Sequence, residues 1–191
     1  MKEALLSLSL IVIAAIAASA QEVIDRSYVT KSGEKVLRFE ATLPVDAKRV
    51  WRAFSDPEDM KGWIAPVIQL DLRVGGVLLT NYDKTAKITD ASTIHLPIVN
   101  YLDGELMTYK VELNNAFPKK LQDEDQNLQE VIQIFDLDGV KTRLVSSMIG
   151  WGSGKEWDDA YAFFAKGNKW TYEELIKHLL KKPDEKVKRI K

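Results

Sequence analysis

The residue types that most often carry chemistry are scarce in this sequence. It contains two histidines, His95 and His178, and no cysteine. His95 lies between two apolar residues in a strand-like segment, and a histidine that faces a cavity can act as a general base near neutral pH. The alternative is that His95 is exposed, or is satisfied by hydrogen bonds within the fold. His178 is flanked by Lys177 and Lys181 and is expected to face solvent.

Metal and phosphate chemistry are not indicated either. The two histidines lack the spacing of metal ligands, and the absence of cysteine excludes thiolate ligands and disulfides. Asp123-x-Asp125-x-Asn127 imitates the start of a calcium loop, but Ile134 stands where the loop needs glutamate. Gly75-Gly76 reads as a hairpin turn, without the lysine of a phosphate-binding loop. We therefore predict no metal and no cofactor, and assign no catalytic residue.

The elements that must position any site begin with a strand and two short helices. Apolar and polar residues alternate over 37–43, which predicts a half-buried strand. Asp46 can cap a helix over 47–54, and Asp56 followed by Pro57 is the start signal of a second one.

The rest of the chain reads as strands followed by one long helix. Turn residues separate strand-like segments at 67–74, 77–82, 93–101, 106–113, 130–137 and 141–149, and the polar stretch 114–127 reads as a loop. Residues 155–182 carry apolar side chains at helical spacing, with a kink or break expected at Gly167-Asn168. An amphipathic helix facing an antiparallel sheet predicts an α+β sandwich with one core.

The first twenty residues differ in kind from the rest. An apolar run from Ala4 to Ala18 follows a short charged start and ends in Ala18-Ser19-Ala20, the pattern that signal peptidase accepts. The alternative is an uncleaved anchor, but a membrane-spanning helix needs about 20 apolar residues. We predict a signal peptide over 1–20, export to the periplasm or the medium, and no stable membrane insertion after cleavage.

The remaining residues are predicted to form one domain. An N-terminal lead-in over 21–35 precedes the domain at 36–182, and a basic, flexible tail follows at 183–191. The tail could attract an anionic partner, although basic ends are also common on soluble helices. The net charge of -1 argues against nucleic-acid binding. Oligomeric state is not indicated.

Several segments together resemble the START-like (SRPBCC) superfamily, and within it the family named after the C-terminal domain of the activator of heat-shock-protein 90 ATPase. They are, in chain order, 50–57 with Ser55-Asp56-Pro57, Trp63, Asp71-Leu72-Arg73-Val74-Gly75-Gly76, Thr142-Arg143-Leu144 with Gly150, and Phe164-Ala165-Lys166-Gly167 with Trp170. The resemblance covers roughly 36–180. The sequence departs from the family pattern at Asn168-Lys169, which separates Gly167 from the tryptophan.

This resemblance implies a helix-grip fold, in which a curved antiparallel sheet of about six or seven strands grips a long C-terminal helix. Similar proteins bind lipids, sterols or other hydrophobic molecules in the cavity between sheet and helix, and a minority are enzymes. Carried onto this chain, the residues expected to line the cavity are Trp63, His95, Tyr101, Met148, Trp157, Tyr161 and Phe164. The alternative is that these side chains fill the core, as aromatic residues at helical spacing usually do.

The leading hypothesis is therefore an exported, non-catalytic protein that binds a hydrophobic small molecule. One alternative is an enzyme of cyclase or hydrolase type that uses His95 in the cavity. Another is a protein-interaction module of the co-chaperone kind, the role that gave the family its name. Export argues against that role, because the ATP-driven chaperone it would serve is cytosolic.

Overall fold

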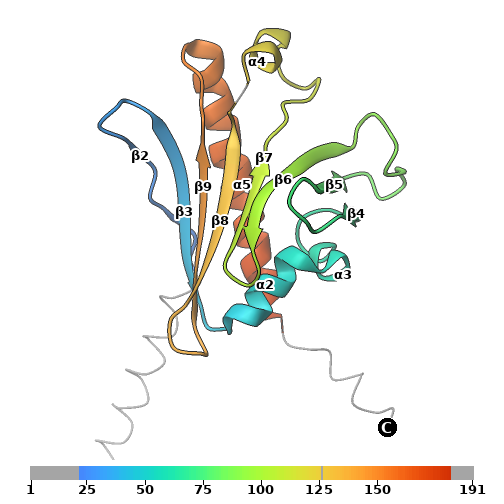
Figure 1. The fold of residues 1–191 in the computed structure, drawn as a ribbon, viewed down its shortest axis with the longest axis vertical. Coiled ribbons are helices and arrows are strands. Elements are labelled where there is room, and N and C mark those ends of the chain that lie inside the picture. The colour runs from blue at the N-terminus through green and yellow to red at the C-terminus, as the bar shows by residue number, and fades with distance from the viewer. Residues whose placement is uncertain (1–21, 126, 182–191) are drawn as a thin grey trace, which may run out of the picture.

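The computed structural model describes residues 22–125 and 127–181. The predicted signal peptide (1–20) and basic tail (183–191) lie outside the described residues, so both remain predictions. The described chain is an α+β fold in which a curved antiparallel sheet packs along one side of a long helix (Figure 1). The predicted helix-grip architecture is confirmed.

The sheet has nine strands instead of the six or seven predicted. Two short strands from the lead-in, β1 and β2, pair with β3 and account for the difference. The order is β1-β3-β9-β8-β7-β6-β5-β4, with β2 also beside β3. The strands are β1 (Ile24–Asp25), β2 (Tyr28–Val29), β3 (Lys35–Leu43), β4 (Val67–Leu70), β5 (Val77–Asn81), β6 (Ile94–Leu102), β7 (Leu106–Lys110), β8 (Gln129–Asp136) and β9 (Thr142–Ile149).

Two short helices follow β3 and start where their capping residues predict. The Asp46 side chain accepts a 2.8 Å hydrogen bond from the Arg49 amide at the start of α2 (Ala47–Ser55). Asp56 caps α3 (Pro57–Met60) in the same way, through the Glu58 amide at 3.0 Å. These bonds satisfy amide groups that the first turn of a helix leaves free.

The predicted loop 114–127 contains a further short helix, α4 (Lys119–Glu124). The last element, α5 (Lys155–Leu180), runs unbroken through Gly167-Asn168, so the predicted break there is wrong. Glycine in a helix interior costs only about 1 kcal/mol. Packing of the inner side of α5 outweighs that cost, because residues on both sides of Gly167 are buried against the sheet: Trp157, Ala160, Tyr172, Leu175, Ile176 and Leu179.

The core lies between α5 and one face of the sheet, here called the inner face. Alternate residues of β3, among them Leu37 and Phe39, are buried on it. The outer face carries the residues between them, such as the ion pair Arg38–Glu40. Among the described residues, no helix is both long and apolar enough to cross a membrane.

Candidate functional site

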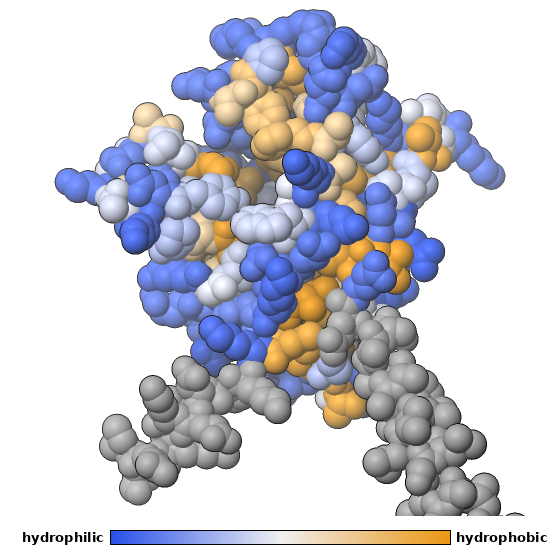
Figure 2. Space-filling model, turned by 180° about the vertical axis from the view of Figure 1, so that it is seen from behind, coloured by the Kyte–Doolittle hydropathy of each residue, from blue (hydrophilic) through white to orange (hydrophobic). Residues whose placement is uncertain are grey.

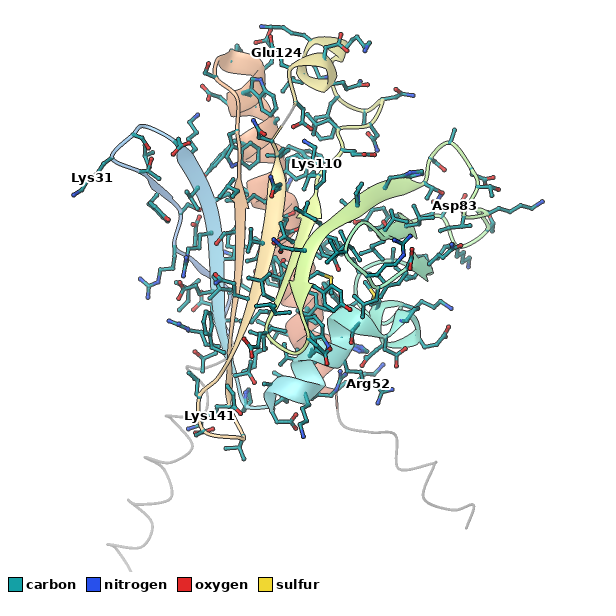
Figure 3. All side chains as sticks on the ribbon, viewed as in Figure 1. Lys31, Arg52, Asp83, Lys110, Glu124 and Lys141 are labelled. Carbon is teal, nitrogen blue, oxygen red and sulfur yellow. The ribbon has the colours of Figure 1, made fainter. Side chains whose placement is uncertain are left out.

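A small cavity lies between the inner face of the sheet and α5, with a volume of about 50 Å³. Its lining comes from three parts of the fold. The sheet supplies Tyr109, Glu130 and Ile132, α5 supplies Asn168, Thr171 and Tyr172, and the α2–α3 region supplies Phe54, Met60, Trp63 and Ile64. In Figure 3 the sheet lies in front of α5, and the side chains of both are drawn as sticks.

Glu130 is the only ionisable acid in this lining. It lies on β8 in register with Tyr109 of β7 and Met148 of β9. Its Oε1 accepts hydrogen bonds from the Tyr172 hydroxyl at 2.7 Å and from the Ser146 hydroxyl at 2.8 Å. Within the described residues, no hydrogen bond reaches Oε2 and no cation pairs with this carboxyl group. The cavity therefore holds an acid with one oxygen free for a further partner.

The environment of Glu130 changes the ionisation of three side chains. Burial raises the pKa of Glu130 above its ordinary value, although the bonds from Tyr172 and Ser146 lower it in part. Burial, with the neighbouring Glu130 charge, likewise raises the pKa of Tyr172 well above its usual value, and also that of Tyr109. Both phenols therefore stay protonated and available as hydrogen-bond donors.

Tyr109 is the one residue of the cavity lining whose fully buried side-chain polar atom has no hydrogen-bond partner among the described residues. The residue is 4% exposed, and its hydroxyl makes no hydrogen bond within the described part of the chain. An unpaired buried hydroxyl costs about 1–3 kcal/mol, so most are bonded. A hydroxyl left free beside Glu130 marks a position where a ligand or a water completes the network.

The cavity can bind a polar group, but its own side chains offer little else. It contains a carboxyl group, hydroxyls and the Asn168 amide, and none of its lining residues is a lysine, arginine or histidine. Among the described residues, no group of three or more His, Cys, Asp or Glu side chains is placed to hold a metal ion. The arrangement fits recognition of a hydrogen-bonding group in an otherwise apolar enclosure.

Of the seven residues predicted to line the cavity, Trp63 does so. Its ring packs edge-on against Phe54 at 5.1 Å, and its indole nitrogen donates to the Ala53 carbonyl at 2.9 Å. Met148 is buried on the inner face, and its sulfur accepts from the Asn168 amide at 3.0 Å, just outside the lining. Tyr101 stacks on Trp51 with ring centroids 6.4 Å apart, away from this cavity.

The other three predicted aromatics lie toward the N-terminal half of α5. Trp157 is buried and donates from its indole nitrogen to Glu124, the residue labelled at the end of α4 in Figure 3. Tyr161 and Phe164 pack against Trp151, with centroids 4.9 and 5.8 Å away. These residues form an aromatic cluster beyond the cavity, and they do not line it.

The expected place of His95 needs correction. His95 is exposed on β6 and pairs in register with Leu79. Leu78 and Ile98, at alternating positions of the same strand pair, are buried on the inner face. Because side chains alternate between the two faces of a strand, His95 points outward and does not enter the cavity. It cannot serve there as a general base.

His178 also differs from its prediction. Instead of facing solvent, it is largely buried against the α2–α3 segment, where its Nε2 contacts the Asp59 carboxylate. Arg49 donates to the same carboxylate at 2.7 Å. This contact is structural and lies at the opposite end of α5 from the aromatic cluster.

Sequence reasoning missed the polar residues of the cavity, and one of them carried a readable signal. Glu130 lies on the same face of its strand as Ile132 and Ile134, at every second position, and both isoleucines are buried. A charged residue at an otherwise apolar position of an alternating strand predicts an inward-pointing acid. Tyr109 and Tyr172 gave no comparable signal, because buried tyrosines are ordinary core residues.

Comparisons with known proteins agree with this fold. The sequence model of the family described as "Activator of Hsp90 ATPase homolog 1-like protein" matches residues 44–181. A search of curated proteins found no match.

Solved structures share the architecture at low sequence identity. The chain is similar to a conserved protein of unknown function from Enterococcus faecalis, with a TM-score of 0.60, 12% identity, and coverage of 87% of this chain and 82% of that one. It is also similar to CalU16 from Micromonospora echinospora, with a TM-score of 0.58, 15% identity, and coverage of 89% of this chain and 90% of that one. A third similar structure is the Aha1 dimer from Colwellia psychrerythraea, with a TM-score of 0.58, 10% identity, and coverage of 75% of this chain and 95% of that one. These likenesses concern the fold alone.

Since the family model spans most of the chain, this protein belongs to the Activator of Hsp90 ATPase homolog 1-like family of the START-like superfamily.

Proposed function

We propose that this chain is an exported binding protein for a small hydrophobic molecule, held without covalent chemistry between the sheet and α5. The observation that carries the proposal is the unpartnered Tyr109 hydroxyl beside Glu130 in a cavity with largely apolar walls. A few convergent polar groups in an apolar enclosure are the usual form of a small-molecule site.

The cavity size limits which part of a ligand it takes. Sites for drug-sized molecules measure about 300–1,000 Å³, whereas this cavity measures about 50 Å³. It therefore accepts the polar end of a ligand, and a larger apolar body requires α5 and its neighbours to move apart. The binding-competent state is wider than the one described.

The export part of the proposal is supported by the signal-like residues 1–20 and by where the fold begins. Val23 is already 3% exposed in the core, and β1 starts at Ile24, shortly after the predicted cleavage site at Ala20. Cell fractionation with intact-mass measurement tests it. A mature protein that starts at Gln21 outside the cytosol is the expected result, and a full-length cytosolic protein would contradict it.

The binding part is tested by native mass spectrometry of the mature protein from its own source, followed by organic extraction. A defined bound mass, displaced when the protein is unfolded, is the expected result. A protein that is empty and also takes up no hydrophobic probe would overturn the proposal. Glu130→Gln is the matched variant, since it alters the carboxyl group and keeps the volume of the cavity.

One observation favours a second candidate, the protein-interaction module. Phe163 is 62% exposed and packs edge-on against Phe117 and Phe164. Apolar residues gather at this end of the molecule when it is viewed from the side of α5 (Figure 2). Exposed aromatic clusters often mark protein contacts. Crosslinking in the native compartment, with Phe163→Ser as the variant, tests this role; unchanged crosslinks would contradict it.

A further inference from the structure

The lining of the sheet–helix cavity is unbalanced in charge. It contains one acid, Glu130, and no lysine, arginine or histidine. Both hydrogen bonds that the carboxyl group accepts come from neutral hydroxyls, those of Tyr172 and Ser146. Glu130 is partly buried, and a carboxylate withdrawn from water without a countercharge is less stable than a paired one. A positively charged ligand would supply the countercharge that the lining of the cavity lacks.

The walls of the cavity suit the same kind of group. Four of its lining residues are aromatic: Phe54, Trp63, Tyr109 and Tyr172. The Trp63 indole N–H is already donated to the Ala53 carbonyl, so the cavity receives its ring and not its polar atom. Aromatic faces attract cations through their quadrupole, by about 0.5–2 kcal/mol each. A carboxylate and aromatic rings together are the chemistry that recognises an ammonium group.

Tyr109 supplies the remaining contact. Its hydroxyl is buried, lines the cavity and makes no hydrogen bond within the described residues. An ammonium group has three N–H donors and no acceptor. One N–H can reach the free Oε2 of Glu130 and another the Tyr109 oxygen, so the donors of the ligand match the two acceptors that the protein leaves open.

We propose that this cavity binds the protonated amino group of a small aliphatic amine, held by the Glu130 carboxylate and the Tyr109 hydroxyl among aromatic rings. The inference rests on the proposed function, because it names the chemical class of the ligand for the same site. A cavity needs about 10–15 Å³ to hold one water, so about 50 Å³ admits an ammonium group and a few carbons.

Other ligand classes fit less well. A carboxylate ligand would place a second negative charge beside Glu130. A neutral alcohol could bond to Glu130 or Tyr109, but it would leave the acid without a countercharge and would gain nothing from the aromatic faces. The structure therefore ranks amines above alcohols, and alcohols above acids.

Titration with three matched probes tests this ranking: n-propylammonium, 1-propanol and propionate, followed by the NMR shift of the Trp63 indole N–H. We expect saturable binding of propylammonium, at least tenfold weaker binding of propanol, and no binding of propionate. Tenfold corresponds to about 1.4 kcal/mol, which is less than the usual contribution of a hydrogen bond to a charged group. Equal binding of the amine and the alcohol, or no binding of the amine, would overturn the inference.

Variants separate this site from adventitious binding. Glu130→Gln should weaken propylammonium binding at least tenfold, whereas Glu112→Gln, which removes an exposed acid outside the cavity, should leave it unchanged. Tyr109→Phe should weaken it about threefold and serves as the second variant should Glu130→Gln fold poorly. Amine affinity retained in Glu130→Gln, or lost equally in Glu112→Gln, would contradict the assignment. If a neutral ligand co-purifies instead, the ammonium inference fails while the proposed binding function stands.

Discussion

His178 Nε2 in the last turns of α5 lies against the carboxylate of Asp59 in α3, although the two residues are 119 positions apart. A carboxylate oxygen accepts hydrogen bonds, so the Nε2–H tautomer of His178 fits this contact. The Asp59 side chain is 7% exposed and also accepts from Arg49 of α2 at 2.7 Å. One carboxylate thus joins α2, α3 and α5 at the end of the domain where α5 closes on the sheet.

We expect Asp59→Ala to lower the free energy of unfolding by about 2–4 kcal/mol, because it leaves two partners of a buried carboxylate unpaired. His178→Ala should cost less, about 1–2 kcal/mol, since Arg49 still pairs with Asp59. Urea denaturation measures both. Lys177→Ala is the control, because its bond to Glu174 is exposed and should contribute under about 0.5 kcal/mol. Equal effects at 177 and 178 would show that the contact is not stabilising.

The two tyrosines that flank Glu130 should respond in opposite ways to loss of the hydroxyl. Tyr109→Phe removes a buried group with no partner and should raise the free energy of unfolding of the ligand-free protein by about 1 kcal/mol. Tyr172→Phe removes a 2.7 Å bond to a carboxyl oxygen and should lower it by about 1–2 kcal/mol. Thermal unfolding of the two variants side by side decides this. Destabilisation by Tyr109→Phe would mean that its hydroxyl has a partner in solution.

Glu130 should make the stability of the free protein depend on pH. Burial raises its pKa in the folded state above the ordinary 4.5. Between 4.5 and the raised value, the folded state holds a proton that the unfolded state has lost. Raising the pH through that window therefore favours unfolding, by at most about 1.4 kcal/mol per pH unit. Urea denaturation across this range should show the wild type losing stability relative to Glu130→Gln as the pH rises. If the free energies of unfolding of the wild type and of Glu130→Gln changed in parallel with pH, the raised pKa of Glu130 would be contradicted.

Two glycines near or within α5 should differ sharply in their response to alanine. A Cβ at Gly167 would meet no atom within 4 Å, so Gly167→Ala should stabilise the helix by about 0.5–1 kcal/mol. A Cβ at Gly152 would overlap the indole of Trp157, so Gly152→Ala should cost about 1–3 kcal/mol. Calorimetric melting temperatures measure the two shifts. A destabilising Gly167→Ala would indicate that the helix needs to bend there.

Much of the fold followed from local signals in the sequence. Asp46 and Asp56 cap their helices as predicted, because a capping carboxylate bonds to amides two or three residues away. Gly104 and Gly139 turn their hairpins with positive φ angles of 81° and 79°, a conformation that glycine adopts without strain. Helix caps and hairpin turns depend on residues that are close together in the chain, so they can be predicted from the sequence.

The candidate site depended on contacts between distant segments. His95 faces outward because pairing with β5 sets the register of β6, and a shift of one residue would have turned it inward. Glu130 meets Tyr172 across 42 residues only when α5 docks on the sheet. The same docking keeps α5 continuous through Gly167. The sequence alone thus determined the main elements and their order, through local hydrogen bonding and periodicity, and the matched segments indicated the family. Tertiary packing alone decided which polar side chains share the cavity, because strand register and helix docking are set by burial summed over the whole core.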